Sequence, residues 1–306
     1  MNIHISNFIT FLKLEKRYSD HTIESYRNDL LQLEAFLIDY YGTDKIFWHL
    51  LNKKIIRYFM TFLQNQKLSR RSIARKLATL KSFLKYLVQQ EIIDQNPALT
   101  IKLPRFEKKL PQYLSERETE QLFELLDDEG FEGIRNWAIL EMFYGTGIRL
   151  SELINLKTSD IYFPENLVRV LGKGRKERVI PLGETAKKVL QHYLTYRAQF
   201  AAKSVENVFV LKSGKAMYPM AVQRIVRNYI TQVSSTEHSH PHILRHSYAT
   251  HLLNAGASIR VVKDLLGHES LSTTQVYTHI SIDHLKNIYN KAHPSAWDKT
   301  NHKLRR

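Results

Sequence analysis

Residues 240–251 read HPHILRHSYATH, and this stretch carries the most information about the fold and the chemistry of the chain. His242 and Arg245 are three residues apart, so on a helix their side chains share one face. An imidazole beside a guanidinium suits an anionic oxygen, because both groups donate hydrogen bonds. His242 and His246 also have the spacing of a zinc pair, but Ile243 replaces the glutamate of such motifs and no carboxylate cluster lies nearby. We therefore expect a helix that binds an anion and no metal.

A second arginine lies upstream, in residues 145–152, which read GTGIRLSE. No strand leads into the Gly-x-Gly, so a dinucleotide site is not indicated. Arg149 follows the glycine turn and has an acidic neighbour, Glu152, three residues later. That neighbour would orient the guanidinium for a bidentate contact with phosphate. The alternative is a helix–turn–helix corner with a surface arginine.

Lys173 lies between two glycines in a basic turn, residues 172–176. The runs 167–170 and 178–181 on either side are β-like and predict a hairpin. The frame of a P-loop is absent, so Lys173 is not a P-loop lysine. It is either a solvated turn residue or a cation that enters a DNA groove and lends a proton.

His268 and Tyr277 are the last two candidate residues along the chain. His268 follows a helix that stops at Gly267, and Tyr277 lies nine residues later on an expected helix, 272–279. Taken alone, one tyrosine among 16 is a packing residue. Together, however, the set combines cationic and hydrogen-bonding donors with one possible nucleophile. Such a set fits phosphoryl transfer by electrostatic clamping and acid–base catalysis without a metal or cofactor.

Composition points to a polyanionic partner. The 306 residues have a formal net charge of +15, and the first 110 hold 19 of the 45 Lys and Arg but only 10 of the 30 acidic residues. Such an excess of positive charge suits binding to nucleic acid or to an anionic membrane surface, but no long amphipathic basic helix favours binding to a membrane. The absence of cysteine excludes disulfides and thiol catalysis. Neither a signal peptide nor a membrane span is indicated, and we expect a cytoplasmic protein.

Hydrophobic periodicity predicts two domains joined by a linker. Residues 1–95 read as a helical bundle, 96–111 as an extended linker with three prolines, and 112–306 as a second domain of helices with the β-hairpin. The expected fold class is mainly α with a small antiparallel β-sheet. Basic side chains lie outside the apolar stripe of one N-terminal helix, and we expect them either to contact DNA phosphates or to form a solvated face: Arg70, Arg71, Arg75, Lys76 and Lys81.

The order of these motifs resembles the tyrosine recombinase and phage integrase family, most closely its Xer-type site-specific recombinases. The motifs are Gly-x-Gly-x-Arg-x-x-Glu, Gly-Lys-Gly, His-x-x-Arg-His, Leu-Gly-His and then Tyr, and the likeness covers essentially the whole chain. It implies a two-domain clamp around double-stranded DNA and a tetramer on two DNA sites. The tetramer would contain copies of this chain or a paralogous recombinase, and an activating protein is a further possible partner.

The resemblance also assigns roles to the site residues. Tyr277 would attack the scissile phosphate and form a 3′-phosphotyrosyl link, while Arg149 and Arg245 hold the non-bridging oxygens. Lys173 would protonate the leaving 5′ oxygen, and the set is completed by two histidines that assist at the phosphate, His242 and His268. The implied task is the resolution of chromosome dimers at segregation. The alternatives are an integrase of a mobile element, a type IB topoisomerase and a DNA-binding protein with an inactive site.

Overall fold

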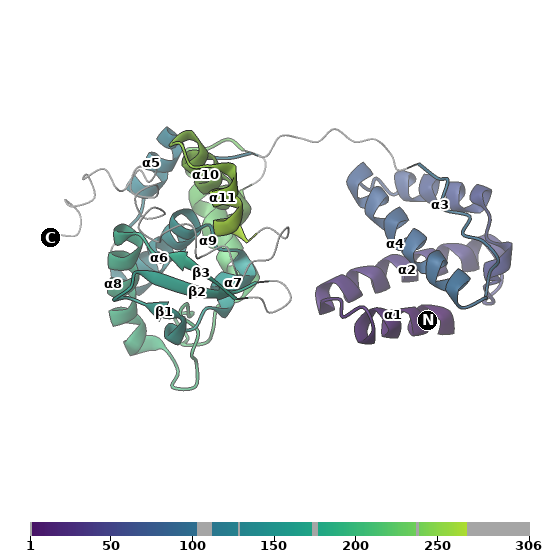
Figure 1. Ribbon diagram of the computed structural model, residues 1–306, viewed down its shortest axis with the longest axis horizontal. Helices are drawn as coiled ribbons and strands as arrows, with labels where there is room; N and C mark the ends of the chain where they lie inside the picture. Colours follow the sequence, from purple (N-terminus) through teal and green to yellow (C-terminus); the bar gives the residue numbers. More distant parts are fainter. Residues whose placement is uncertain (1, 103–111, 128, 173–176, 237–238, 268–306) are drawn as a thin grey trace. The chain divides into compact units, whose positions relative to one another are not determined.

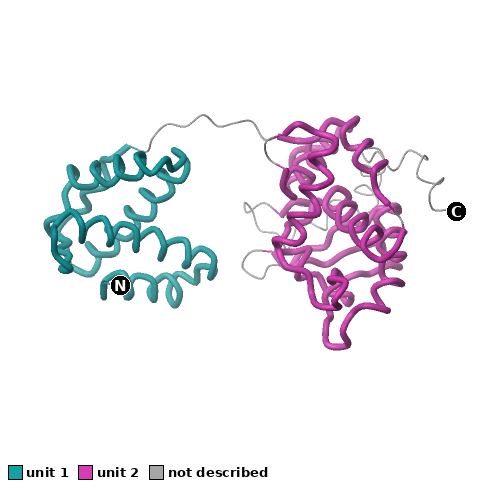
Figure 2. The backbone as a smooth tube through the Cα atoms, turned by 180° about the vertical axis from the view of Figure 1, so that it is seen from behind, with its two compact units in different colours: residues 1–109 teal, residues 110–306 magenta. Residues whose placement is uncertain are grey.

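The chain forms two compact units, residues 1–109 and 110–306 (Figure 2). Each unit has its own hydrophobic core. The residues that the computed structural model describes are 2–102, 112–127, 129–172, 177–236 and 239–267.

The first unit is helical (Figure 1). Ser19 and Ser69 cap two of its helices, because their side-chain oxygens accept hydrogen bonds from backbone N–H groups of the first turn. Gly42, in the left-handed conformation, ends the longest helix of this unit. The apolar faces meet in a single core. The elements are α1 (Ile3–Leu14), α2 (Asp20–Tyr41), the 3-10 helix η1 (Trp48–Leu50), α3 (Lys53–Asn65) and α4 (Arg70–Gln89).

Residues 96–101 pack on this helical unit. Ala98 and Ile101 are buried in its core, and the Asn96 amide donates a hydrogen bond to the Lys81 carbonyl at 3.0 Å. The start of the segment that the sequence predicts as a linker is therefore held by α4, because two of its apolar side chains leave water.

The sequence predicts domain boundaries at 1–95, 96–111 and 112–306, and these stay a prediction. The two compact units divide between residues 109 and 110. Residues 103–111 lie outside the described part of the chain.

The second unit combines helices with a three-stranded sheet, so the predicted fold class is confirmed. A capping box begins its first helix, with Ser115 Oγ accepting from the Glu118 N–H at 3.2 Å and the Glu118 carboxylate accepting from the Ser115 N–H at 2.8 Å. The elements are α5 (Glu116–Glu124), α6 (Gly130–Thr146), α7 (Leu150–Asn155), the 3-10 helix η2 (Thr158–Asp160), β1 (Ile161–Tyr162), β2 (Leu167–Leu171), β3 (Glu177–Pro181), α8 (Glu184–Phe200), α9 (Pro219–Val233), α10 (Pro241–Asn254) and α11 (Ile259–Leu266).

The sheet is antiparallel in the order β1-β2-β3, which confirms the predicted hairpin. Val168 pairs with Ile180, and both side chains are buried on one face. The helix predicted at 272–279 lies outside the described residues. Among the described helices, none is both long and apolar enough to cross a membrane.

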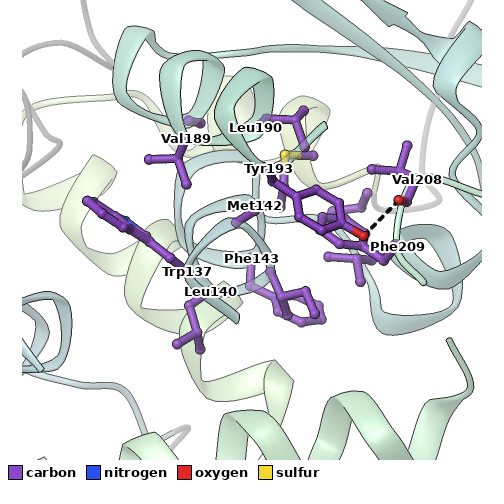
Figure 3. Close-up of a cluster of buried hydrophobic side chains, with 14 of the residues drawn as sticks. Trp137, Leu140, Met142, Phe143, Val189, Leu190, Tyr193, Val208 and Phe209 are labelled. Carbon is purple, nitrogen blue, oxygen red and sulfur yellow. Dashed lines mark hydrogen bonds between the residues drawn. The ribbon is translucent and has the colours of Figure 1, made fainter. Parts of the chain in front are cut away.

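Helix α6 lies at the centre of the second unit and packs on α8 (Figure 3). Trp137 and Phe143 of α6 and Leu190 of α8 belong to this core. The hydroxyl of the buried Tyr193 donates to the Val208 carbonyl at 3.1 Å, and burial raises the pKa of this phenol to about 12.

Helices α10 and α11 form a second apolar cluster of their own. Tyr248 and Leu252 from α10 pack with Val262, Leu265 and Leu266 from α11. Because α10 also packs on α6, the C-terminal end of the short helix α11 is brought to the end of α6.

Candidate phosphate-binding site

The turn after α6 favours glycine for two reasons. Gly147 has φ of +60°, and a Cβ atom built on it would lie 2.7 Å from Tyr248 Cδ1 and 2.9 Å from Leu266 Cδ2. Both distances are far below van der Waals contact, and positive φ disfavours other residues. The close approach of three helices therefore depends on this glycine.

Arg149 follows that turn and is fixed on two sides. The Glu152 carboxylate accepts from the Arg149 backbone N–H at 2.7 Å and from Arg149 Nη1 at 2.8 Å. Arg149 Nη2 donates to the carbonyl of Gly267 at 2.8 Å. The stretch is a corner between two helices, but the arginine side chain is only 29% exposed. Its guanidinium therefore has a defined orientation.

Arg245 is buried on α10 and donates to two carbonyls, Gly147 from Nη1 and Leu266 from Nη2, the latter at 2.5 Å. Arg149 and Arg245 thus bind adjacent carbonyls, those of Gly267 and Leu266, at the end of α11. The last carbonyls of a helix lack intrahelical partners and carry partial negative charge, which attracts cations. The helix end therefore brings the two guanidinium groups side by side.

His242 faces the same cationic group. Loss of hydration lowers the pKa of His242, and repulsion from His240, Arg245, His246 and Arg149 lowers it further. Since an ordinary histidine titrates near 6.5, this imidazole is neutral at pH 7. A neutral ring both accepts and donates a proton, so it can take part in acid–base chemistry beside the arginines.

Burial lowers the pKa of Arg245, and repulsion from Arg149 and Arg178 adds to this effect, whereas Glu152 opposes it. A guanidinium nevertheless keeps its proton in proteins. Three cations therefore lie near one carboxylate, and the site retains a positive excess that favours an anionic ligand.

Arg178 is a site residue that the sequence does not reveal, because its stretch, 178–181, indicates only a β-strand. It is buried on β3, and its two Nη atoms bind the two oxygens of Glu152 at 2.5 and 2.8 Å. Strand alternation places it on the same inward face as Ile180. An arginine at an inward position of a strand is the signal that could have identified it.

Three predicted residues, Lys173, His268 and Tyr277, lie outside the described part of the chain. Of the predicted catalytic set, the described residues Arg149, His242 and Arg245 are therefore the ones that the structure brings together.

The predicted basic face of α4 divides into two groups. Arg70 and Arg71 are exposed. Arg75 and Lys76 instead bind the buried carboxylate of Asp29, through Arg75 Nη2 at 2.8 Å and Lys76 Nζ at 2.9 Å. The Lys76 side chain is only 10% exposed, whereas that of Arg75 is 49% exposed.

Lys81, the fifth basic residue, is turned toward the segment after α4. Its Nζ donates to the carbonyls of Leu99 at 3.3 Å and Ile101 at 2.7 Å. This lysine therefore holds the chain that leaves the helical unit.

Another histidine of α10 contacts a tyrosine of α6. His251 is buried, and its Nδ1 hydrogen-bonds the Tyr144 hydroxyl at 2.9 Å. Within the described residues, no group of three or more His, Cys, Asp or Glu is arranged to hold a metal ion.

Comparison with known proteins identifies the class. Residues 112–284 match the phage integrase family, and residues 5–91 match the phage integrase N-terminal SAM-like domain. The chain is 42% identical over 302 residues to tyrosine recombinase XerC of Oceanobacillus iheyensis, covering 97% of each protein. It is 40% identical over 314 residues to tyrosine recombinase XerC of Chlorobaculum parvum, covering 94% of each.

Solved structures share the fold. The XerH site-specific recombinase bound to palindromic difH substrate gives a TM-score of 0.70 at 21% identity, over 92% of this chain and 82% of that one. The Tn1549 transposon integrase in complex with circular intermediate DNA gives 0.70 at 18% identity, over 92% and 98%.

The fold and the arginine pair, with these matches, define an enzyme that cuts and rejoins DNA at specific sites. The chain belongs to the phage integrase family and is a tyrosine recombinase.

The replacement Glu152→Gln tests the charge balance of the site. Burial by itself raises the pKa of Glu152, but hydrogen bonds and charge from Arg178, together with hydrogen bonds from Arg149, outweigh it and lower the pKa below 4.5. The ionised form is thus stabilised in the folded protein. At pH 7 the variant should lose about 3 kcal/mol of unfolding free energy, measured in urea. The loss should persist down to about pH 4.5 and shrink as pH falls through the lower folded pKa, where the wild-type carboxylate is protonated.

Glu206→Gln is the matched control. Glu206 also pairs with a cation, Lys157, at 2.7 Å, but its side chain is 69% exposed. Exposed pairs contribute little, so this variant should stay within about 0.5 kcal/mol of wild type. Equal losses of unfolding free energy in Glu152→Gln and Glu206→Gln would contradict a special role for the buried carboxylate.

Proposed function

We propose that Arg149 and Arg245 hold the two non-bridging oxygens of a scissile DNA phosphate. The observation that carries this proposal is their attachment to adjacent carbonyls, Gly267 and Leu266. Each guanidinium has five N–H donors, and these contacts orient it while leaving its charge in place. Donors fixed before the reaction stabilise developing charge without reorganisation.

Tyr277 then attacks the phosphorus, and the bond to the 5′ oxygen breaks. The products are a 3′-phosphotyrosyl link and a 5′ hydroxyl, which takes its proton from Lys173. His242 assists proton transfer by accepting the proton that the Tyr277 hydroxyl loses, for which its neutral state at pH 7 is suitable. His268, next in sequence to Gly267, donates to the phosphate. The phosphodiester energy is retained in the covalent link, so the reverse attack rejoins the strand without ATP.

The biological task that we propose is the resolution of chromosome dimers at segregation, in the cytoplasm. The support is the near-complete match to proteins named tyrosine recombinase XerC. The two units clamp duplex DNA, and four subunits, either identical or shared with a paralogue, act on two sites. An activating protein is compatible with this arrangement.

Phosphate contacts of the helical unit come first from Arg70 and Arg71, because these side chains are exposed at the start of α4. Arg75 contributes from the edge of the Asp29 cluster. Lys76 and Lys81 support the face from within, since both donate hydrogen bonds inside the unit.

Covalent trapping tests the chemistry and the task together. Wild type and Tyr277→Phe are incubated with chelator and with nicked fragments of the source genome, and denatured covalent complexes are isolated and their DNA sequenced. The wild type should give a band that survives the chelator, the Tyr277→Phe variant should give none, and the trapped DNA should come from one chromosomal site.

Two outcomes would contradict the proposal in different ways. A band that persists with Tyr277→Phe would refute the assigned nucleophile. Trapped DNA from the ends of a mobile element would leave the chemistry intact but replace dimer resolution by element integration.

The double variant Arg70→Gln/Arg71→Gln tests the DNA-binding face. Removal of two phosphate contacts should weaken DNA binding and make the dependence of log K on log salt shallower by about 2. Thermal stability should be unchanged, because neither side chain is buried.

Lys53→Gln/Lys54→Gln, on α3, removes the same charge from another helix. It should leave the salt slope near the wild-type value. If the slope of log K against log salt becomes equally shallow in both double variants, DNA binding depends on general charge and not on the start of α4.

A further inference from the structure

Arg178 has no role in the chemistry proposed above, yet its side chain is buried at the centre of the site. It projects from β3, in register opposite Val170 of β2, and is 9% exposed. A buried arginine is costly unless its donors are matched by acceptors. The residues that Arg178 contacts therefore indicate its role.

The first partner is the carboxylate of Glu152. Arg178 binds both oxygens at 2.5 and 2.8 Å, in the bidentate geometry that fixes a carboxylate most firmly. The same two oxygens accept from the backbone N–H and from Nη1 of Arg149. Arg178 thus holds the group that orients one of the two phosphate-binding arginines.

The second partner is the end of α11. Arg178 Nε donates to the Leu265 carbonyl at 3.3 Å, and the side chain lies against Gly267, where an added Cβ would be 3.0 Å from Arg178 Cδ. Three consecutive carbonyls thus accept from three arginines: Leu265 from Arg178, Leu266 from Arg245 and Gly267 from Arg149.

The position of Arg178 in the chain adds a third connection. Arg178 is the second residue of β3 and lies five residues after Lys173. The strand that follows the basic turn is therefore linked to Arg149 through Glu152, and to the end of α11 through the Leu265 carbonyl.

We propose that Arg178 is a positioning residue, which locks Glu152 and the end of α11 so that Arg149 and Arg245 are aligned for the scissile phosphate. This inference rests on the proposed function. Arg178 acts through other residues, and misplacement of catalytic groups by about 1 Å costs up to about a hundredfold in rate. Its loss should therefore slow cleavage without abolishing DNA binding.

The charges around Glu152 make the role measurable by pH. The charged groups that face it in the described residues are cations: Arg149 at the start of α7, Arg178 from β3 and Arg245 from α10. Without Arg178, burial raises the pKa of Glu152 and less charge opposes it. Protonated Glu152 cannot accept the same hydrogen bonds from Arg149, so cleavage then depends on its titration.

The test is the single-turnover rate of covalent complex formation on nicked DNA, with saturating protein. Arg178→Met should be roughly ten- to a hundredfold slower than wild type at pH 8. The ratio of variant to wild-type rate should fall further as pH is lowered to about 5.5. For the double variant Arg178→Met/Glu152→Gln, the ratio of its rate to the wild-type rate should not depend on pH, because the amide of the introduced glutamine does not titrate.

Two further variants make the result decisive. Arg169→Met removes an arginine of the same sheet that binds Asp160 at 2.7 Å, and should keep the wild-type rate and profile. Arg178→Lys keeps the charge but not the bidentate contact, so its cleavage rate should lie between those of wild type and Arg178→Met. If urea unfolding shows that Arg178→Met does not fold, Arg178→Lys replaces it in the test.

A wild-type rate and profile in both Arg178 variants would overturn the inference. A slower rate with no pH dependence, unaffected by Glu152→Gln, would also overturn it, since that result describes general destabilisation. The absence of covalent complex in wild type would instead refute the proposed function.

Discussion

The site depends on one constraint, which is that the carbonyls at the end of α11 need hydrogen-bond donors. Leu265, Leu266 and Gly267 form the last turn, where the helix itself supplies no donors and the dipole is negative. Three arginines from three other elements meet this need. Like charges would otherwise repel, so the helix end and the Glu152 carboxylate together are what allow guanidinium groups to be placed side by side.

The remainder of the second unit keeps that helix end in place. Gly147 lets α6 turn against Tyr248 and Leu266 without a side chain in the way. Helix α10 carries both Arg245 and His242, and its apolar side chains join α11 to the main body. Packing thus determines where the cations lie, and the cations determine the chemistry. The ligand that we propose, a DNA phosphate with two exposed oxygens on one phosphorus, fits this arrangement.

The sequence was sufficient for the fold class, the hairpin and the helices with clear apolar periodicity, because local spacing and capping residues specify them. It also placed Arg149, His242 and Arg245 in one set through motif order. It could not specify which basic residues of α4 remain exposed, since the burial of Lys76 depends on Asp29, 47 residues away. The role of Arg178 could not be predicted for the same reason. Its partners are distant in sequence, and only the folded sheet brings it to Glu152.

The most direct measurement is the crystal structure of Tyr277→Phe bound to its DNA site. We expect Arg149 and Arg245 to donate to the two non-bridging oxygens of one phosphate, while Arg149 keeps its hydrogen bond to the Gly267 carbonyl and Arg245 keeps its bond to the Leu266 carbonyl. Arginines that bind different phosphates, or that lose their hydrogen bonds to those carbonyls when DNA binds, would contradict this arrangement.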